Sequence, residues 1–126
     1  MRKKVINTAN APEAAGPYSQ AVSAGGFVFV SGQIPAEPET GKITDGGIEK
    51  QAERVIKNLT AVLAAWGLSL SDVVKTTVYL KNMSDFSPVN EVYSRYFASP
   101  YPARSCVEAK LPKDALIEIE AVAAKR

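Results

Sequence analysis

The fold is decided by residues 48–80, which read IEKQAERVIKNLTAVLAAWGLSLSDVVKTTVYL. In residues 48–67, apolar side chains recur at helical spacing, charged side chains fall between them, and Gly67 is positioned to end the helix. In residues 73–80, β-branched and aromatic side chains predominate, which favours a strand. The stretch therefore predicts an amphipathic helix followed by a strand. The apolar helix positions are Ile48, Ala52, Val55, Ile56, Leu59, Val62, Leu63 and Trp66.

Further strands are predicted on both sides of this unit. Two apolar runs near the N-terminus are joined by Gly25-Gly26, a dipeptide that tolerates positive φ and indicates a two-residue hairpin turn. Near the C-terminus, the turn-like Pro112-Lys113-Asp114 separates two extended runs. In the last run, apolar residues alternate with Glu118 and Glu120, so one face is apolar and the other carries two carboxylates. The predicted strands cover residues 3–8, 22–24, 27–31, 73–80, 103–110 and 116–123.

A second helix is predicted to begin after Asp85 and to end before Pro100. Asp85 is placed as its N-cap, and Pro88 falls within the first turn, where proline is tolerated. The apolar and aromatic residues of this segment trace one helix face. They are Phe86, Val89, Tyr93, Tyr96 and Phe97.

The order of these elements predicts an α+β fold, in which a mixed sheet of about six strands carries both helices on one face. At 126 residues, the chain is expected to form a single domain spanning residues 1–126. The opposite face of the sheet, which would bear Val107 and Glu118, then needs either water or a partner subunit.

Composition excludes several classes of protein. The formal net charge of +2, with basic and acidic residues interleaved, gives no clustered basic surface, so we do not expect nucleic acid as a partner. We interpret Arg2-Lys3-Lys4 as a solvated end, because the apolar segment of a targeting signal does not follow it. No run reaches the roughly 18 uncharged apolar residues that a membrane span requires.

Histidine is absent, and Cys106 is the only cysteine. A single cysteine cannot form an internal disulfide, so we expect a reducing compartment, the cytoplasm, with the mitochondrion as the alternative. The usual zinc ligands are missing, and we expect neither a metal nor an organic cofactor. Any chemistry must use Arg, Glu, Asp, Tyr, Ser, Lys, the cysteine or ordered water.

Arg104 and Glu118 are the main catalytic candidates. Arg104 follows Pro102-Ala103 at the start of a predicted strand, and its planar guanidinium can donate two parallel hydrogen bonds to a carboxylate. The alternative is a surface arginine or an ion pair between subunits. Glu118 lies in an apolar strand, where a covering neighbour would raise its pKa toward the range useful for proton transfer. The alternative is an exposed position of an alternating strand.

Three further positions have both a functional and a structural interpretation. Cys106 would need an activating base to act as a nucleophile, so a small buried side chain is favoured. Tyr18, after Gly16-Pro17, could present its hydroxyl to a substrate or pack with that hydroxyl in water. Ser31-Gly32 could offer backbone N–H groups to an anion, although glycine also commonly marks turns.

Five short motifs run along the chain: GPYSQA at residues 16–21, SGQIP at 31–35, NEVY at 90–93, PARSC at 102–106 and IEIEA at 117–121. Taken together, in this order and spacing, they resemble the RidA family, also called the YjgF family. The similarity spans nearly the whole chain and is closest to the deaminase-type members. The resemblance implies a chorismate-mutase-like α+β fold that assembles as a homotrimer, with the sheets forming a central barrel, the helices outside and three clefts between subunits.

The resemblance also implies an activity and a set of site residues. The activity is cofactor-independent hydrolysis of reactive enamines and imines, such as 2-aminoacrylate, to 2-oxo acids and ammonia, as in a 2-iminobutanoate/2-iminopropanoate deaminase. Arg104 would hold the substrate carboxylate, and Glu118 would position or activate the attacking water. An imine carbon is already electrophilic, so these two functions suffice. The implied substrate-binding residues are Tyr18, Ser31, Gly32, Phe86, Asn90, Arg104 and Cys106, the last through its backbone N–H.

Other functions stay open beside this one. One is a trimeric protein that senses small carboxylates, or acts as a chaperone, without turnover. Members of the family are also credited with RNA cleavage and translation inhibition. The small net charge and the lack of histidine disfavour RNA cleavage and translation inhibition, which rank third.

Overall fold

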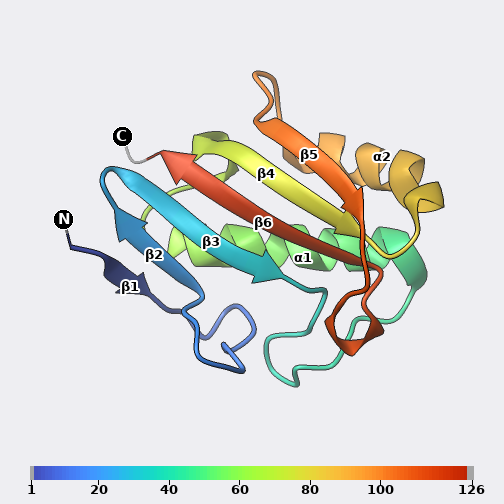
Figure 1. Cartoon of the computed structure of the whole chain (residues 1–126), viewed down its shortest axis with the longest axis horizontal. Helices are drawn as coiled ribbons and strands as arrows, with labels where there is room; N and C mark the ends of the chain where they lie inside the picture. The colour runs from blue at the N-terminus through green and yellow to red at the C-terminus, as the bar shows by residue number, and fades with distance from the viewer. Residues whose placement is uncertain (1, 125–126) are drawn as a thin grey trace.

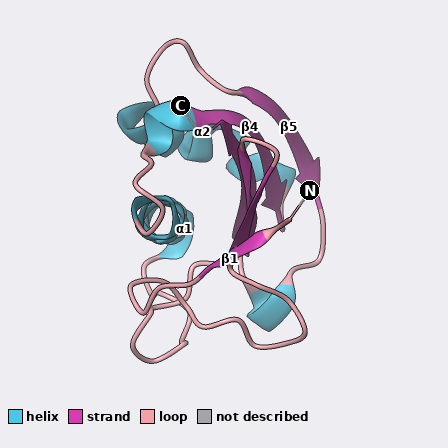
Figure 2. Ribbon diagram, turned by 90° about the vertical axis from the view of Figure 1, so that its left-hand side faces the viewer, coloured by secondary structure: helices cyan, strands magenta, loops and turns pink. Residues whose placement is uncertain are grey.

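Within residues 2–124, which the structure describes, a six-stranded mixed sheet carries two α-helices on one face (Figures 1 and 2). The structure is a computed structural model. Its elements are β1 (Lys4–Ile6), β2 (Ala21–Ala24), β3 (Phe27–Gln33), α1 (Gly47–Ala64), η1 (Leu70–Asp72), β4 (Val73–Leu80), η2 (Met83–Asp85), α2 (Phe86–Tyr96), β5 (Ala103–Glu108), η3 (Pro112–Asp114) and β6 (Ile117–Ala124). The strand order is β1-β2-β3-β6-β4-β5, in which only β4 and β5 pair in parallel. The predicted α+β arrangement is confirmed.

The predicted N-terminal hairpin is confirmed as β2 and β3. Gly25 and Gly26 have φ values of 59° and 84°, the left-handed conformations that a two-residue hairpin turn requires. Strand β3 continues past the predicted end to Gln33, and its register with β6 shifts between Val30 and Gln33. Strand β1 is shorter than residues 3–8 and covers Lys4–Ile6.

The predicted long helix is confirmed as α1, with an earlier end. The backbone N–H of Gly67 donates to the Ala64 carbonyl, and that of Leu68 donates to the Leu63 carbonyl, both at 3.0 Å. With Gly67 at a φ of 76°, this pattern is a Schellman motif, which terminates the helix. Gly67 therefore acts as the predicted stop, and Trp66 belongs to the terminating turn.

Asp85 precedes α2 as predicted, but its side chain makes no capping hydrogen bond. The backbone N–H of Asp85 instead donates to the Asn82 carbonyl at 3.0 Å and closes η2. The prediction of an N-cap is thus correct for position and wrong for mechanism, because the preceding 3₁₀ turn leads directly into the helix.

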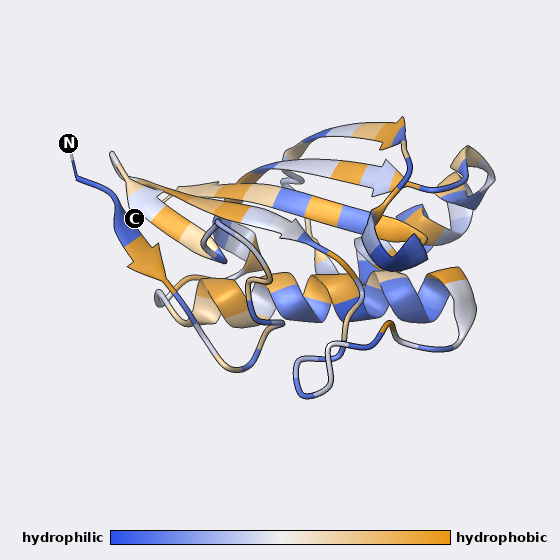
Figure 3. Ribbon diagram, turned by 60° about the horizontal axis from the view of Figure 1, so that its bottom comes forward, coloured by the Kyte–Doolittle hydropathy of each residue, from blue (hydrophilic) through white to orange (hydrophobic). Residues whose placement is uncertain are grey.

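The hydrophobic core lies between the helices and the sheet. The apolar side of α1 faces the strands, and its charged side faces outward (Figure 3). Strand residues that alternate toward the helices are buried with it. The largest fully buried side chains are Ile56, Leu59, Leu63, Leu80, Ile117 and Ile119.

Neither α1 nor α2 covers the opposite side of the sheet, and we call this side the open face (Figure 2). Large apolar side chains remain exposed on its strands, including Val5, Phe27, Phe29 and Val107. Among residues 2–124, no helix has the length and apolar character needed to cross a membrane. The sequence correctly placed Val107 and Glu118 on this uncovered face.

Candidate active site

Arg104 is held at the edge of the sheet on the helix-covered side. It lies on β5, where its register partner on β4 is the fully buried Thr76. Its Nη1 donates a 2.8 Å hydrogen bond to Asn90 Oδ1 on α2. Its guanidinium carbon lies 4.9 Å from the ring centroid of Tyr93 and 5.6 Å from that of Phe86. These contacts fix the cation while leaving it exposed to a ligand.

Tyr93 supports this arrangement from within the core. Its hydroxyl shares a buried 2.9 Å hydrogen bond with Thr76 Oγ1, and its ring stacks on Phe97 with centroids 4.2 Å apart. Burial raises the pKa of Tyr93, against opposing effects of the Thr76 hydrogen bond and the Arg104 charge. Beside the guanidinium is a cavity of about 320 Å³. Asn90, Tyr93, Ser94, Tyr101, Pro102 and Arg104 line it.

Cys106 follows Arg104 on the same side of β5, opposite Val78 of β4. It is partly buried and packs against the core. Burial raises the pKa of its thiol, and the nearby Arg104 charge lowers it by a smaller amount. A raised pKa disfavours the reactive thiolate, which agrees with the interpretation of Cys106 as a small buried side chain and not as a nucleophile.

Glu118 lies on the open face of β6. Its neighbours Ile117 and Ile119 are fully buried on the helix side, and strand alternation directs Glu118 the other way. The carboxylate lies directly over Gly32 of β3: a Cβ atom at position 32 would be 2.1 Å from Glu118 Oε2. Burial, followed by the charge of Glu120, raises the pKa of Glu118. A carboxyl group with a raised pKa is better matched to proton transfer near neutral pH.

Tyr18 and Ser31 complete the surroundings of Glu118. These residues line one cavity of about 550 Å³ with Gly32 and Glu118. The Ser31 hydroxyl donates to the Ser19 carbonyl at 2.6 Å, and the Ser31 N–H donates to the Gln20 carbonyl at 2.9 Å. The Ser31 N–H is thus not free to bind an anion, so the interpretation of Ser31 as a backbone donor to an anion is wrong. Tyr18 is 55% exposed, and its hydroxyl accepts a 3.3 Å hydrogen bond from the Ala15 N–H.

The candidate residues therefore form two separate groups in one chain. Arg104, Phe86, Asn90 and Cys106 lie at the β5 edge on the helix side, whereas the Glu118 group lies on the open face. The cavities beside Arg104 and beside Glu118 share no lining residue. Arg104 and Glu118 therefore line different cavities of one protomer.

Sequence reasoning missed two contributors to these groups. Tyr93 was assigned only to the apolar face of a helix, although its spacing of three residues from Asn90 places both on one side of α2. Tyr79 on β4 was also missed, because its contact comes from strand pairing that the sequence does not display. Its hydroxyl donates a 2.6 Å hydrogen bond to Glu120 Oε1, which raises the pKa of Tyr79.

Comparison with known proteins agrees with this fold and its motifs. The family model described as Endoribonuclease L-PSP matches residues 8–125. A RutC family protein of Pyrococcus abyssi is 57% identical over 126 residues, covering 99% of each chain. A Salmonella typhimurium protein named 2-iminobutanoate/2-iminopropanoate deaminase is 48% identical over 127 residues, covering 98% of each chain.

Solved structures show the same architecture. RidA from the Antarctic bacterium Psychrobacter sp. matches with a TM-score of 0.93 and 44% identity, covering 96% of this chain and 98% of that chain. E. coli TdcF with bound serine matches with a TM-score of 0.92 and 45% identity, covering 98% and 99%. The fold and the matches define a small α+β protein of the Endoribonuclease L-PSP class. The chain belongs to the Rid (YjgF) family, as its motifs predicted, and some of its relatives are named deaminases.

Proposed function

We propose that this protein hydrolyses reactive 2-imino acids and their enamine tautomers, such as 2-aminoacrylate, to 2-oxo acids and ammonia without a cofactor. In this reaction water adds to the C=N carbon, the C–N bond then breaks, and nitrogen leaves as ammonia while the added oxygen becomes the ketone. The deaminase name of a relative with 48% identity supports this choice of reaction.

The observation that carries the proposal is the fixed but exposed guanidinium of Arg104. The hydrogen bond that it donates to Asn90 and the rings of Tyr93 and Phe86 hold one side of it. The remaining N–H groups can grip a carboxylate in two parallel hydrogen bonds. Such a grip orients a small imino acid and reduces the entropy cost of reaching the transition state.

Glu118 supplies the second function, the placement and activation of water. As a carboxylate it can accept a proton from the attacking water, and as a carboxylic acid it can return that proton to the leaving nitrogen. Because the pKa of Glu118 is raised, the carboxylic acid form is more accessible near neutral pH than for an ordinary glutamate. Gly32 beneath it provides the space that the carboxylate occupies.

We propose that the two halves of the site meet between protomers of a homotrimer. One protomer would supply the Arg104 group at its β5 edge, and a neighbour would supply the Glu118 group from its open face. The exposed apolar side chains Val5, Phe27, Phe29 and Val107 support burial of this face against another subunit. A cyclic trimer repeats the same contact between neighbouring subunits, so each contact would form one complete active site.

The test is turnover of 2-aminoacrylate, generated in place by a serine or threonine dehydratase, with 2-oxo acid formation followed above the spontaneous rate. Loss of the charged anchor in Arg104→Ala is expected to cost 2 to 4 kcal/mol, or about 30-fold to 1000-fold in rate. Arg95→Ala is the matched control, because Arg95 is exposed on α2 and pairs with Glu53 and Glu91. A wild-type rate no higher than that of Arg104→Ala would reject the proposal.

A binding protein without turnover is the second candidate. The solved structure of E. coli TdcF holds serine, so a relative with 45% identity binds a small amino acid. Calorimetry separates the two functions: binding of a 2-oxo acid with no acceleration of imine hydrolysis would favour the binding protein. RNA cleavage, an activity credited to members of the family, is not proposed for this chain, because the chain lacks histidine and its formal net charge is only +2.

A further inference from the structure

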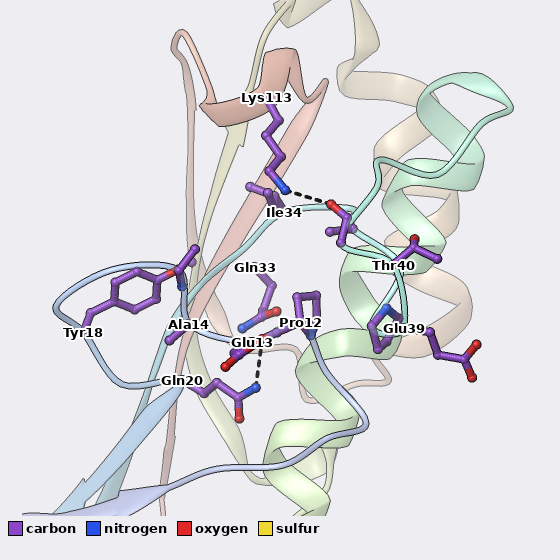
Figure 4. A pocket seen from close by; sticks show the side chains of 15 residues that line it. Pro12, Glu13, Ala14, Tyr18, Gln20, Gln33, Ile34, Glu39, Thr40 and Lys113 are labelled. Carbon is purple, nitrogen blue, oxygen red and sulfur yellow. Dashed lines mark hydrogen bonds between the residues drawn. The ribbon is translucent and has the colours of Figure 1, made fainter.

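A second cavity lies beside the Glu118 group, on the other side of the end of β3. It has a volume of about 530 Å³, within the range of small-molecule sites. The loop of residues 12–18 forms one wall, the loop of residues 34–41 forms another, and Lys113 of η3 lies at the mouth (Figure 4). The proposed deamination gives no role to Glu13, Gln33 or the loop of residues 36–41 in this cavity.

Gln33 is the unusual residue in this cavity. It is only 5% exposed, yet no hydrogen bond joins its carboxamide to any group within residues 2–124. The carboxamides of the buried residues Gln20, Gln51 and Asn58 all take part in hydrogen bonds. Figure 4 shows the Gln33 side chain directed into the cavity. The carboxamide atoms themselves are not shut off from solvent, so their donors and acceptor can serve a ligand in the cavity.

The walls around Gln33 are already fixed. Gln20 Nε2 donates to the carbonyls of Pro12 at 2.8 Å and Thr8 at 3.0 Å, which holds the first loop. Asn58 Nδ2 donates to the carbonyl of Ala36 at 3.0 Å, which holds the second loop on α1. A preformed cavity loses little entropy on binding, which favours a specific ligand.

The charges at the cavity restrict the ligand class. Lys113 Nζ donates one 2.8 Å hydrogen bond to the Gly41 carbonyl, and its two other N–H donors can serve a carboxylate. Glu13 adds a carboxylate to the lining, which can accept from an ammonium group, whereas Glu39 points away from the cavity (Figure 4). A cation, an anion and a buried carboxamide together match a zwitterion that carries an amide.

We propose that this cavity binds an amino acid whose side chain ends in a carboxamide, glutamine or asparagine. The ligand amide forms paired hydrogen bonds with Gln33, its α-carboxylate lies toward Lys113, and its ammonium group lies toward Glu13. The bound amino acid adjoins the candidate active site, because five residues line both this cavity and the Glu118 cavity: Ala15, Tyr18, Gly32, Ile34 and Lys113.

Calorimetric titration of the full chain with L-glutamine, L-glutamate and L-methionine tests the proposal. These probes share the zwitterion and similar length, and only glutamine carries the amide. We expect one glutamine per chain, bound at least about tenfold more tightly than the other two, and a similar loss in Gln33→Met, which removes the amide at constant length. Equal binding of methionine or glutamate, wild-type affinity in Gln33→Met, or no binding of glutamine overturns the proposal.

Two further variants keep the result interpretable. Lys113→Met, at an exposed position, tests the carboxylate contact without touching the core, and it is expected to weaken glutamine binding while the thermal unfolding midpoint stays unchanged. Arg104→Ala is expected to retain glutamine affinity. Loss of affinity in Arg104→Ala, with retention in Lys113→Met, would place the ligand at the Arg104 group and contradict the assignment.

Discussion

Substitution of Gly32 by alanine tests whether the position of the Glu118 carboxylate matters for activity. The added Cβ would lie 2.1 Å from Glu118 Oε2 and 2.8 Å from Cδ, whereas ordinary contacts begin at 3.4 Å. The carboxylate must therefore move by about 1.3 Å, the difference between 3.4 Å and 2.1 Å. A misplacement of about 1 Å in a catalytic group costs on the order of 100-fold in rate. We expect kcat/KM for 2-aminoacrylate to fall by about that factor.

The free energy of unfolding is expected to change far less. Gly32 is not among the glycines with positive φ, so alanine introduces no backbone strain. The colliding group is the end of a flexible side chain, and alanine reduces the entropy of the unfolded chain, so the change should stay within about 1 kcal/mol. Chemical denaturation measures this quantity beside the dehydratase-coupled assay.

Gly16→Ala is the matched control. Its added Cβ meets only the Tyr18 ring at 3.5 Å, an ordinary contact, and both activity and stability are expected to stay close to the wild type. A folded Gly32→Ala variant with kcat/KM within about threefold of the wild type would refute the reasoning, because the displaced carboxylate would then have no role in the rate.

Three other changes probe the surroundings of the two groups. Asn90→Leu removes the hydrogen bond that orients Arg104, and KM is expected to rise roughly tenfold with a smaller change in kcat; an unchanged KM would contradict this. Glu120→Gln removes a negative charge that raises the pKa of Glu118, so the acidic limb of the pH profile of kcat/KM should move to lower pH, and a shift to higher pH would oppose the assignment. Tyr93→Phe leaves a buried hydroxyl on β4 without its partner and should lower the free energy of unfolding by about 1 to 3 kcal/mol, measured in denaturant.

The fold was largely predictable because its signals are local. The spacing of apolar residues in α1, the β-branched run of β4 and the glycine pair before β3 each specify an element from adjacent residues. Asp85 shows the limit of local signals: the residue type suggested a side-chain cap, but the 3₁₀ turn that precedes α2 takes its place.

The candidate site was predictable in its residues and not in their arrangement. Arg104 and Glu118 follow from the motifs, but their separation onto two faces depends on which strand residues pair with Thr76 and Tyr79. Strand pairing across the sheet is a tertiary property that adjacent residues do not encode. The close approach of Glu118 to Gly32 depends on the same pairing.

Mixing of two inactive variants tests the central claim that the two halves of the site come from different protomers. Arg104→Ala and Glu118→Gln are each expected to keep at most about 3% of wild-type activity alone, a loss of 30-fold or more. After co-refolding in equal amounts, about a quarter of the contacts in a cyclic assembly would pair an intact Arg104 with an intact Glu118. We predict recovery of roughly a quarter of wild-type activity. Activity no higher than the mean of the two parents, in a mixture shown to have exchanged subunits, would contradict the account.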